Sequence, residues 1–101
     1  MNLLQELQAR TETAQKSTPE EVKSVFDAIV NQCLVVADMG RNSVYVDSTD
    51  IDTAVRDFDA QGCRESSFDD AFTRALARVV DEGVIVRTTR EEHLFLLEWA
   101  D

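Results

Sequence analysis

The sequence predicts an α+β fold in which helices pack on a small three-stranded antiparallel sheet. The first observation is a change of apolar spacing, from helical over residues 68–82 to strand-like over 84–86. The second is Gly83 between them, since glycine suits the left-handed conformation that follows many helices. The third is the polar segment 88–92 between two apolar runs, which indicates a hairpin. With the elements that precede it, this segment gives the order α-α-β-α-α-β-β.

Two helices are expected before the first strand. The first, over residues 2–16, carries a narrow stripe of leucines and is otherwise polar. The second, over 19–39, has a strong start signal, because Thr18 and Glu21 can form a capping box with Pro19 at the first helical position. Its apolar face is wide enough to make it the central helix of the core.

The later elements follow from the same signals. Ser67 and Asp70 are expected to close a second capping box at the start of the helix 68–82. Alternating side chains predict a short strand that starts at Ser43, and a third helix is expected to follow the polar segment 48–50. The expected ranges are 43–47 for that strand, 51–61 for the third helix, and 84–88 and 93–99 for the hairpin.

At 101 residues the chain is expected to form one domain, with residues 1–17 as a leading helix and 18–101 as the core. The leading helix is expected to pack on the body, to fray, or to pair two copies as a homodimer. Trp99 is expected to pack against the second helix, and the alternative is partial exposure near the C-terminus as an anchor for a partner. The expected core residues are Phe26, Ile29, Cys33, Val44, Val46, Phe58, Phe72, Leu76, Val79 and Leu96.

The charge balance is the one unusual feature of the composition. Twenty acidic and ten basic residues give a net charge of −10, which repels nucleic acid and anionic membranes and favours a partner with a basic surface. No run of apolar residues is long enough to span a bilayer, and the N-terminus lacks a signal peptide, so we expect a cytoplasmic protein. Cys33 is expected to be reduced and buried, Cys63 lies in an expected loop, and a disulfide between them is the alternative.

The segment from Phe72 to Arg87 resembles the recognition helix and wing of winged-helix regulators. In that family a leucine-bearing helix ends in Glu-Gly, here Glu82-Gly83, and a hydrophobic strand follows. The resemblance covers about the last half of the chain. It implies that residues 51–61 and 68–82 form a helix-turn-helix and that the hairpin forms the wing.

A second resemblance is to small uncharacterised proteins of tailed phages. A long helix ending in 37–41, the strand 43–46, the run 83–86 and a final strand ending in Trp99 are similar to those proteins. The resemblance implies a compact α+β fold and an origin in a phage or mobile element. It supplies no catalytic residues.

An acidic face on the third helix and the loop before it is the first candidate site. Its members offer carboxylates to a basic partner: Asp47, Asp50, Asp52, Asp57 and Asp59. Residues 47–52 also invite a calcium interpretation, but a calcium loop needs a glycine for its sharp turn, and none is present. Competing helix caps explain the cluster better. We expect no metal and no cofactor.

A basic group in the last third is the alternative site, for DNA. It consists of Arg74, Arg78, Arg87 and Arg90. In a DNA-binding winged helix these side chains would contact phosphates or guanine edges. Six nearby acids leave this surface net negative, so binding of nucleic acid is not expected.

No catalytic motif is apparent. His93 is the only histidine, beside Glu91 and Glu92, and no nucleophile accompanies it. Ser66 and Ser67 lack the surrounding motif of a nucleophile elbow. The leading hypothesis is a small acidic interaction protein that is not an enzyme. In its concrete form it is encoded by a phage and inhibits or modulates a host protein that handles nucleic acid, by mimicking nucleic-acid charge. A DNA-binding transcriptional regulator and a minor virion or assembly protein are the alternatives.

Overall fold

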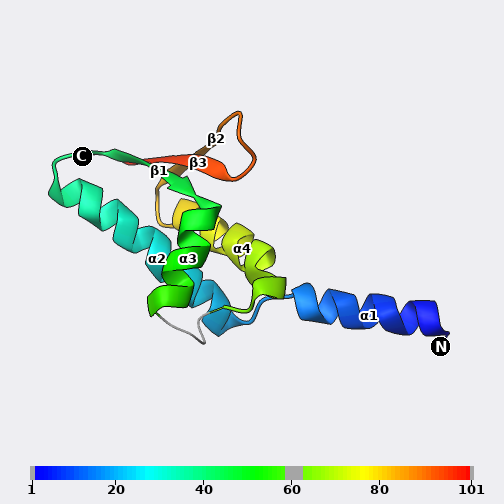
Figure 1. Cartoon of the computed structure of the whole chain (residues 1–101). Coiled ribbons are helices and arrows are strands. Elements are labelled where there is room, and N and C mark those ends of the chain that lie inside the picture. The colour runs from blue at the N-terminus through cyan, green and yellow to red at the C-terminus, as the bar shows by residue number, and fades with distance from the viewer. Residues whose placement is uncertain (1, 59–62, 101) are drawn as a thin grey trace.

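A computed structural model describes residues 2–58 and 63–100, with only the backbone described at 57 and 58. It confirms the α+β fold and the predicted order of elements (Figure 1). The resemblance to winged-helix regulators stays a prediction. The elements are α1 (Leu3–Gln15), α2 (Pro19–Asp38), β1 (Ser43–Asp47), α3 (Ser48–Phe58), the 3-10 turn η1 (Glu65–Ser67), α4 (Phe68–Asp81), β2 (Ile85–Thr88) and β3 (Leu94–Glu98).

The three strands form one antiparallel sheet in the order β1-β3-β2. Helices α2, α3 and α4 lie on one side of this sheet (Figure 1). The predicted strand 43–47 is confirmed at both ends. Gly83 has a φ of +99°, so the predicted left-handed stop after α4 is also confirmed.

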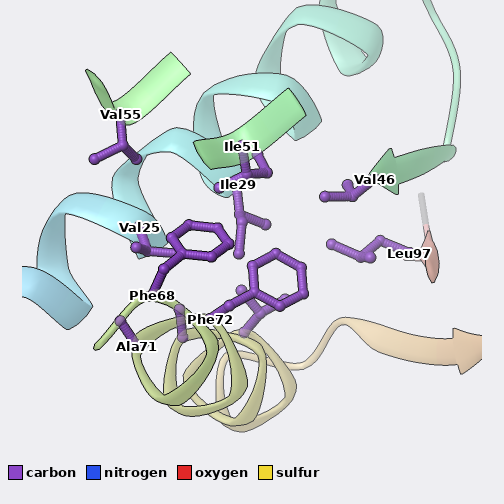
Figure 2. Packing of buried hydrophobic residues seen from close by; sticks show 11 residues of the cluster. Val25, Ile29, Val46, Ile51, Val55, Phe68, Ala71, Phe72 and Leu97 are labelled. Atoms are coloured by element: carbon purple, nitrogen blue, oxygen red, sulfur yellow. The ribbon is translucent and has the colours of Figure 1, made fainter. Parts of the chain in front are cut away.

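The core lies between the inner face of the sheet and the helices (Figure 2). Phe72 is its aromatic centre, with ring centroids 5.8 Å from Phe68 and 5.5 Å from Phe95. Of the predicted core, Ile29, Val46, Phe72 and Val79 are buried. Four others pack against that cluster while half-buried, namely Phe26, Cys33, Val44 and Leu76. The side chain of Phe58 lies outside the described part of the chain.

The prediction that Leu96 belongs to the core is wrong. Leu96 pairs with Tyr45, which is 63% exposed, so both side chains lie on the outer face of the sheet. Leu97 pairs with Val44 and is completely buried. Because side chains alternate along a strand, a shift of one residue exchanges the buried and exposed positions.

Helix α3 begins at Ser48, not at Ile51 as predicted. The backbone N–H of Thr49 donates to Oδ1 of Asp47 at 2.8 Å, so the last residue of β1 supplies the polar partner at the start of the helix. Ser48, Thr49 and Asp50 therefore lie in the first turn instead of preceding it. The predicted end of this helix at Gln61 lies outside the described residues.

Helix α1 extends away from the rest of the molecule (Figure 1). No residue of Leu3–Gln15, all of which are described, is buried. Its links to the body are to main-chain carbonyls: Ser66 Oγ donates to the Ala14 carbonyl, and Arg64 Nη2 donates to the Lys16 carbonyl, each at 3.0 Å. The radius of gyration of 15.3 Å exceeds the ~13 Å typical of a compact chain of this length, in agreement with the projecting helix.

Removal of residues 2–15 is expected to change the free energy of unfolding by about 1 kcal/mol or less, because α1 contributes no buried side chain and one hydrogen bond from Ser66. Urea denaturation of the full-length and shortened chains would measure the difference. A loss of several kcal/mol would contradict the separation into a leading helix and a core.

Candidate functional site

A polar network joins the start of α2 to the start of α4, and Glu21 is its centre. The Glu21 side chain is 7% exposed. Its Oε2 accepts hydrogen bonds from the Ser67 hydroxyl at 2.6 Å and from the Arg64 backbone at 2.8 Å. Its Oε1 accepts from the Thr18 backbone at 2.9 Å and from Arg64 Nη2 at 3.1 Å. The carboxylate is therefore satisfied on both oxygens, and the capping box predicted for Thr18 is confirmed.

The ionised form of Glu21 is strongly favoured. Burial alone would raise its pKa, but the hydrogen bonds from Arg64, Ser67 and Thr18 outweigh burial and hold the pKa well below its usual range. A carboxylate with so low a proton affinity does not act as a general base near neutral pH. The network is therefore a structural link between α2 and α4.

The capping box predicted for Ser67 and Asp70 is wrong. Ser67 donates to Glu21, while Asp70 Oδ2 accepts from the Ser17 hydroxyl at 2.6 Å and from the Ser17 backbone at 2.8 Å. These bonds from Ser17, with a contribution from Arg74, lower the pKa of Asp70 to about 2. Both residues have found partners distant in sequence, which local spacing does not reveal.

The predicted acidic face is only partly available to a partner. Asp50 is exposed, but Asp47 accepts from the start of α3, and Asp52 Oδ1 is 3.1 Å from Arg56 Nε. The side chain of Asp57 and the whole of Asp59 lie outside the described residues. Among the described residues, no group of three or more histidine, cysteine or acidic side chains is arranged to hold a metal ion.

The four arginines of the alternative DNA site are not gathered on one surface. Arg74 and Arg78 lie on α4, packed on the inner side of the sheet, while Arg87 pairs with Leu96 on its outer face. Arg74 Nε is 3.1 Å from Asp70, and Arg87 Nε is 3.1 Å from Glu98. Arg78 stacks on the Phe26 ring at 4.3 Å. Arg90 lies exposed in the turn of the hairpin.

His93, Cys33 and Cys63 lie in three different parts of the described chain. His93 is exposed, with Nε2 3.5 Å from Glu91 and 3.7 Å from Asp47. Both cysteines are free and half-buried. Burial raises the pKa of the Cys33 thiol and of the Cys63 thiol, so both are protonated at neutral pH.

The second half of α2 is a surface that the sequence analysis missed. None of the described residues 30–38 is buried, although most are apolar. Leu34 is 57% exposed, Val35 53%, and Met39 at the helix end 64%. A helix that is apolar on most sides is normally covered. The unbroken apolar run 33–37, where an amphipathic helix needs polar positions, is the signal that would have revealed it.

Trp99 is tied to the segment that follows the C-terminal end of α2. It does not belong to the cluster of buried residues that the structure describes. Its backbone N–H donates to the Asn42 carbonyl at 3.0 Å, three residues beyond Met39. The indole is half-buried and lines a hollow of about 400 Å³ with Ser43, Ile85 and Glu98. Trp99 is therefore not part of the buried core, and its partial exposure agrees with the alternative stated above.

Comparison of the chain with models of protein families, with curated proteins and with solved structures finds no match. None of the described helices is both long and apolar enough to cross a membrane.

Proposed function

We propose that this chain is an interaction protein, without catalytic activity, that binds a protein partner with a basic surface. The distribution of charge is the observation that supports it. Some arginines are held by contacts within the chain, as in the pairs Arg74–Asp70 and Arg87–Glu98. The twenty acidic residues outnumber the ten basic ones, and Asp50 and Glu92 are exposed and in no ion pair with a described residue. The surface offered to a partner is therefore dominated by carboxylates.

The concrete form of the proposal is a phage-encoded modulator of a host protein. A protein that handles nucleic acid presents a basic groove, and a chain of net charge −10 can compete for that groove. The host cytoplasm is the proposed location.

A pull-down with the full chain from a bacterial lysate, with and without nuclease, tests the proposed function. Basic proteins should be retained in both samples and released by added salt. Salt weakens attraction between charges because the screening length is about 8 Å near physiological ionic strength and becomes shorter as salt is added. Retention that requires intact nucleic acid would contradict the proposal. Each retained protein is then purified and its binding measured directly.

Binding to duplex DNA should be weak, with a Kd above about 100 µM at physiological salt. Few arginines are free to contact phosphates, and the negative net charge of the protein repels the DNA backbone. Fluorescence anisotropy with a labelled duplex measures this. Submicromolar binding that Arg78→Ala abolishes would overturn the proposal and establish the alternative of a DNA-binding regulator.

Neutralising the acidic face is expected to slow association with the basic partner at low salt and to change it little at high salt. The variant combines Asp50→Asn, Asp52→Asn, Asp57→Asn and Asp59→Asn. Stopped-flow association rates at two salt concentrations measure the effect, and circular dichroism confirms the fold. An unchanged rate at low salt would assign this face to solubility alone.

A further inference from the structure

We infer that the projecting helix α1 pairs with the α1 of a second copy of this chain, with the two helices antiparallel (Figure 1). The contact surface is one stripe of α1, which consists of Leu4, Leu7, Thr11 and Ala14 with Leu3 at its margin. This α1 stripe concerns how two copies associate, so the inference does not depend on the proposed basic partner.

The connection between α1 and α2 is held by hydrogen bonds, so the body of the chain sets the direction of α1. Ser17, which is buried, donates from its backbone and its hydroxyl to Asp70 at 2.8 and 2.6 Å. Arg64 and Ser66 donate to carbonyls at the C-terminal end of α1. These bonds satisfy carbonyls that a helix end leaves without partners. A helix that is already formed and oriented loses little freedom on binding, so α1 is prepared for association.

The leucines of α1 are not covered by the body of the chain. Leu3, Leu4 and Leu7 are 70%, 62% and 52% exposed. They lie in the first two turns of α1, at the end that is far from the body (Figure 1). A helix of 13 residues is only marginally stable by itself in water, and packing of an apolar face on another element normally supplies the missing stability.

The charge of α1 favours a second copy over a partner that is attracted to the acidic body. Residues 2–16 contain two acidic and two basic side chains, so the whole net charge of −10 lies on the rest of the chain. Glu6 and Arg10 pair within α1, with 2.9 Å between Oε1 and Nη2. A basic partner is drawn to the body, whereas two neutral helices approach each other without repulsion.

Side-chain size along the α1 stripe favours antiparallel pairing. Its residues follow the alternating three- and four-residue spacing of paired helices. In an antiparallel pair, Leu4 of one copy lies opposite Ala14 of the other. Leu7 likewise lies opposite Thr11, so each leucine meets a smaller side chain and the two faces interdigitate.

The charge of the two bodies favours the same orientation. Antiparallel helices place the bodies at opposite ends of the pair, about 20 Å apart along its axis. This separation exceeds the screening length of about 8 Å at physiological ionic strength, so the repulsion between the bodies is weak. Parallel helices would instead place two bodies, each of charge −10, side by side.

The small size of the contact predicts a weak dimer. Two helices of 13 residues bury less than the roughly 1,000 Å² of a stable complex. We therefore expect a Kd on the order of 10–100 µM for the pair. The chain should be monomeric when dilute and dimeric when concentrated.

Analytical ultracentrifugation of the full chain across about 1–500 µM tests the pairing. Leu4→Ser with Leu7→Ser should weaken the dimer at least tenfold, because it removes the large side chains of the α1 stripe. Leu34→Ser with Met39→Ser removes comparably exposed apolar side chains of α2 and should leave the Kd unchanged. Urea denaturation confirms that the body of each variant folds.

Introduced cysteines test the antiparallel orientation. A mixture of Leu4→Cys chains and Ala14→Cys chains should form disulfide-linked pairs under mild oxidation. Leu4→Cys chains alone should not, because their sulfurs would lie about 15 Å apart along the helix axis, too far for a disulfide. The original chain, which keeps Cys33 and Cys63, is the control for links through the native cysteines.

Four results would overturn the inference. A chain that stays monomeric over the whole concentration range excludes the pair, and loss of the dimer in the α2 variant would move the interface to α2. Linking of Leu4→Cys chains to one another would show that the helices are parallel. If the chain is monomeric and the α1 variant no longer retains the basic proteins of the pull-down, α1 binds the basic partner instead and the proposed function stands.

Discussion

Leu97→Ala is expected to lower the free energy of unfolding by about 3 kcal/mol. Leu97 is completely buried on β3, opposite Val44 on β1 and Val86 on β2. Shortening it to alanine removes apolar contacts with the helices and leaves a cavity between them and the sheet. Urea denaturation followed by circular dichroism measures the loss.

Leu96→Ala is the matched control, since it makes the same chemical change one residue away on the outer face. Leu96 lies opposite Tyr45 and outside the buried cluster, so the expected loss is about 1 kcal/mol or less. Equal losses for the two variants, or a larger loss for Leu96→Ala, would show that the register of β3 is wrong.

Glu21→Gln is expected to cost about 2–3 kcal/mol at pH 7. The amide replaces one carboxylate oxygen by a donor. In the folded protein the carboxylate of Glu21 accepts hydrogen bonds from Arg64, Ser67 and Thr18. The new amide N–H₂ would face N–H or O–H donors of these residues and could not accept from them. Glu20→Gln tests the neighbouring position, which is exposed and in no ion pair with a described residue, and should change stability by about 0.5 kcal/mol or less.

The loss caused by Glu21→Gln should shrink as the solution is made acidic. The pKa of Glu21 lies below its usual range in the folded protein, whereas the unfolded value is about 4.3. The unfolded state therefore binds a proton first, and the stabilisation is complete above about pH 5 and declines as the pH falls further. Urea denaturation of the original chain and of Glu21→Gln from pH 7 to pH 3 measures this trend. A difference in unfolding free energy between the two that does not vary with pH would exclude it.

The local elements could be predicted from the sequence because their signals act between near neighbours. The Thr18–Glu21 capping box and Pro19 mark the start of α2, and Gly83, with its positive φ, marks the stop after α4. Apolar spacing placed Ile29, Phe72 and Val79 in the core. In each case the signal lies in residues that are close together in the sequence.

The partners of polar groups were decided by the tertiary structure. Ser67 and Asp70 have capping-box spacing, like Thr18 and Glu21. Ser67 nevertheless binds Glu21 at the start of α2, and Asp70 binds Ser17 in the segment between α1 and α2. Hydrogen bonds to a carboxylate are stronger than those between neutral groups, so the bonds from Ser67 to Glu21 and from Ser17 to Asp70 prevail over the local cap. The arginines were separated in the same way, because strand register sets which face of the sheet Arg87 lies on.

What the sequence by itself determined is the α+β class, the order of elements, most of their boundaries and the excess of negative charge. The tertiary structure alone decided that Leu97 is buried in place of Leu96, since a run of apolar residues has no alternation to fix its register. It also decided that the apolar second half of α2 stays exposed. Apolar content predicts which residues favour burial. Only the packing of α3, α4 and the sheet against α2 determines which of its apolar residues are covered.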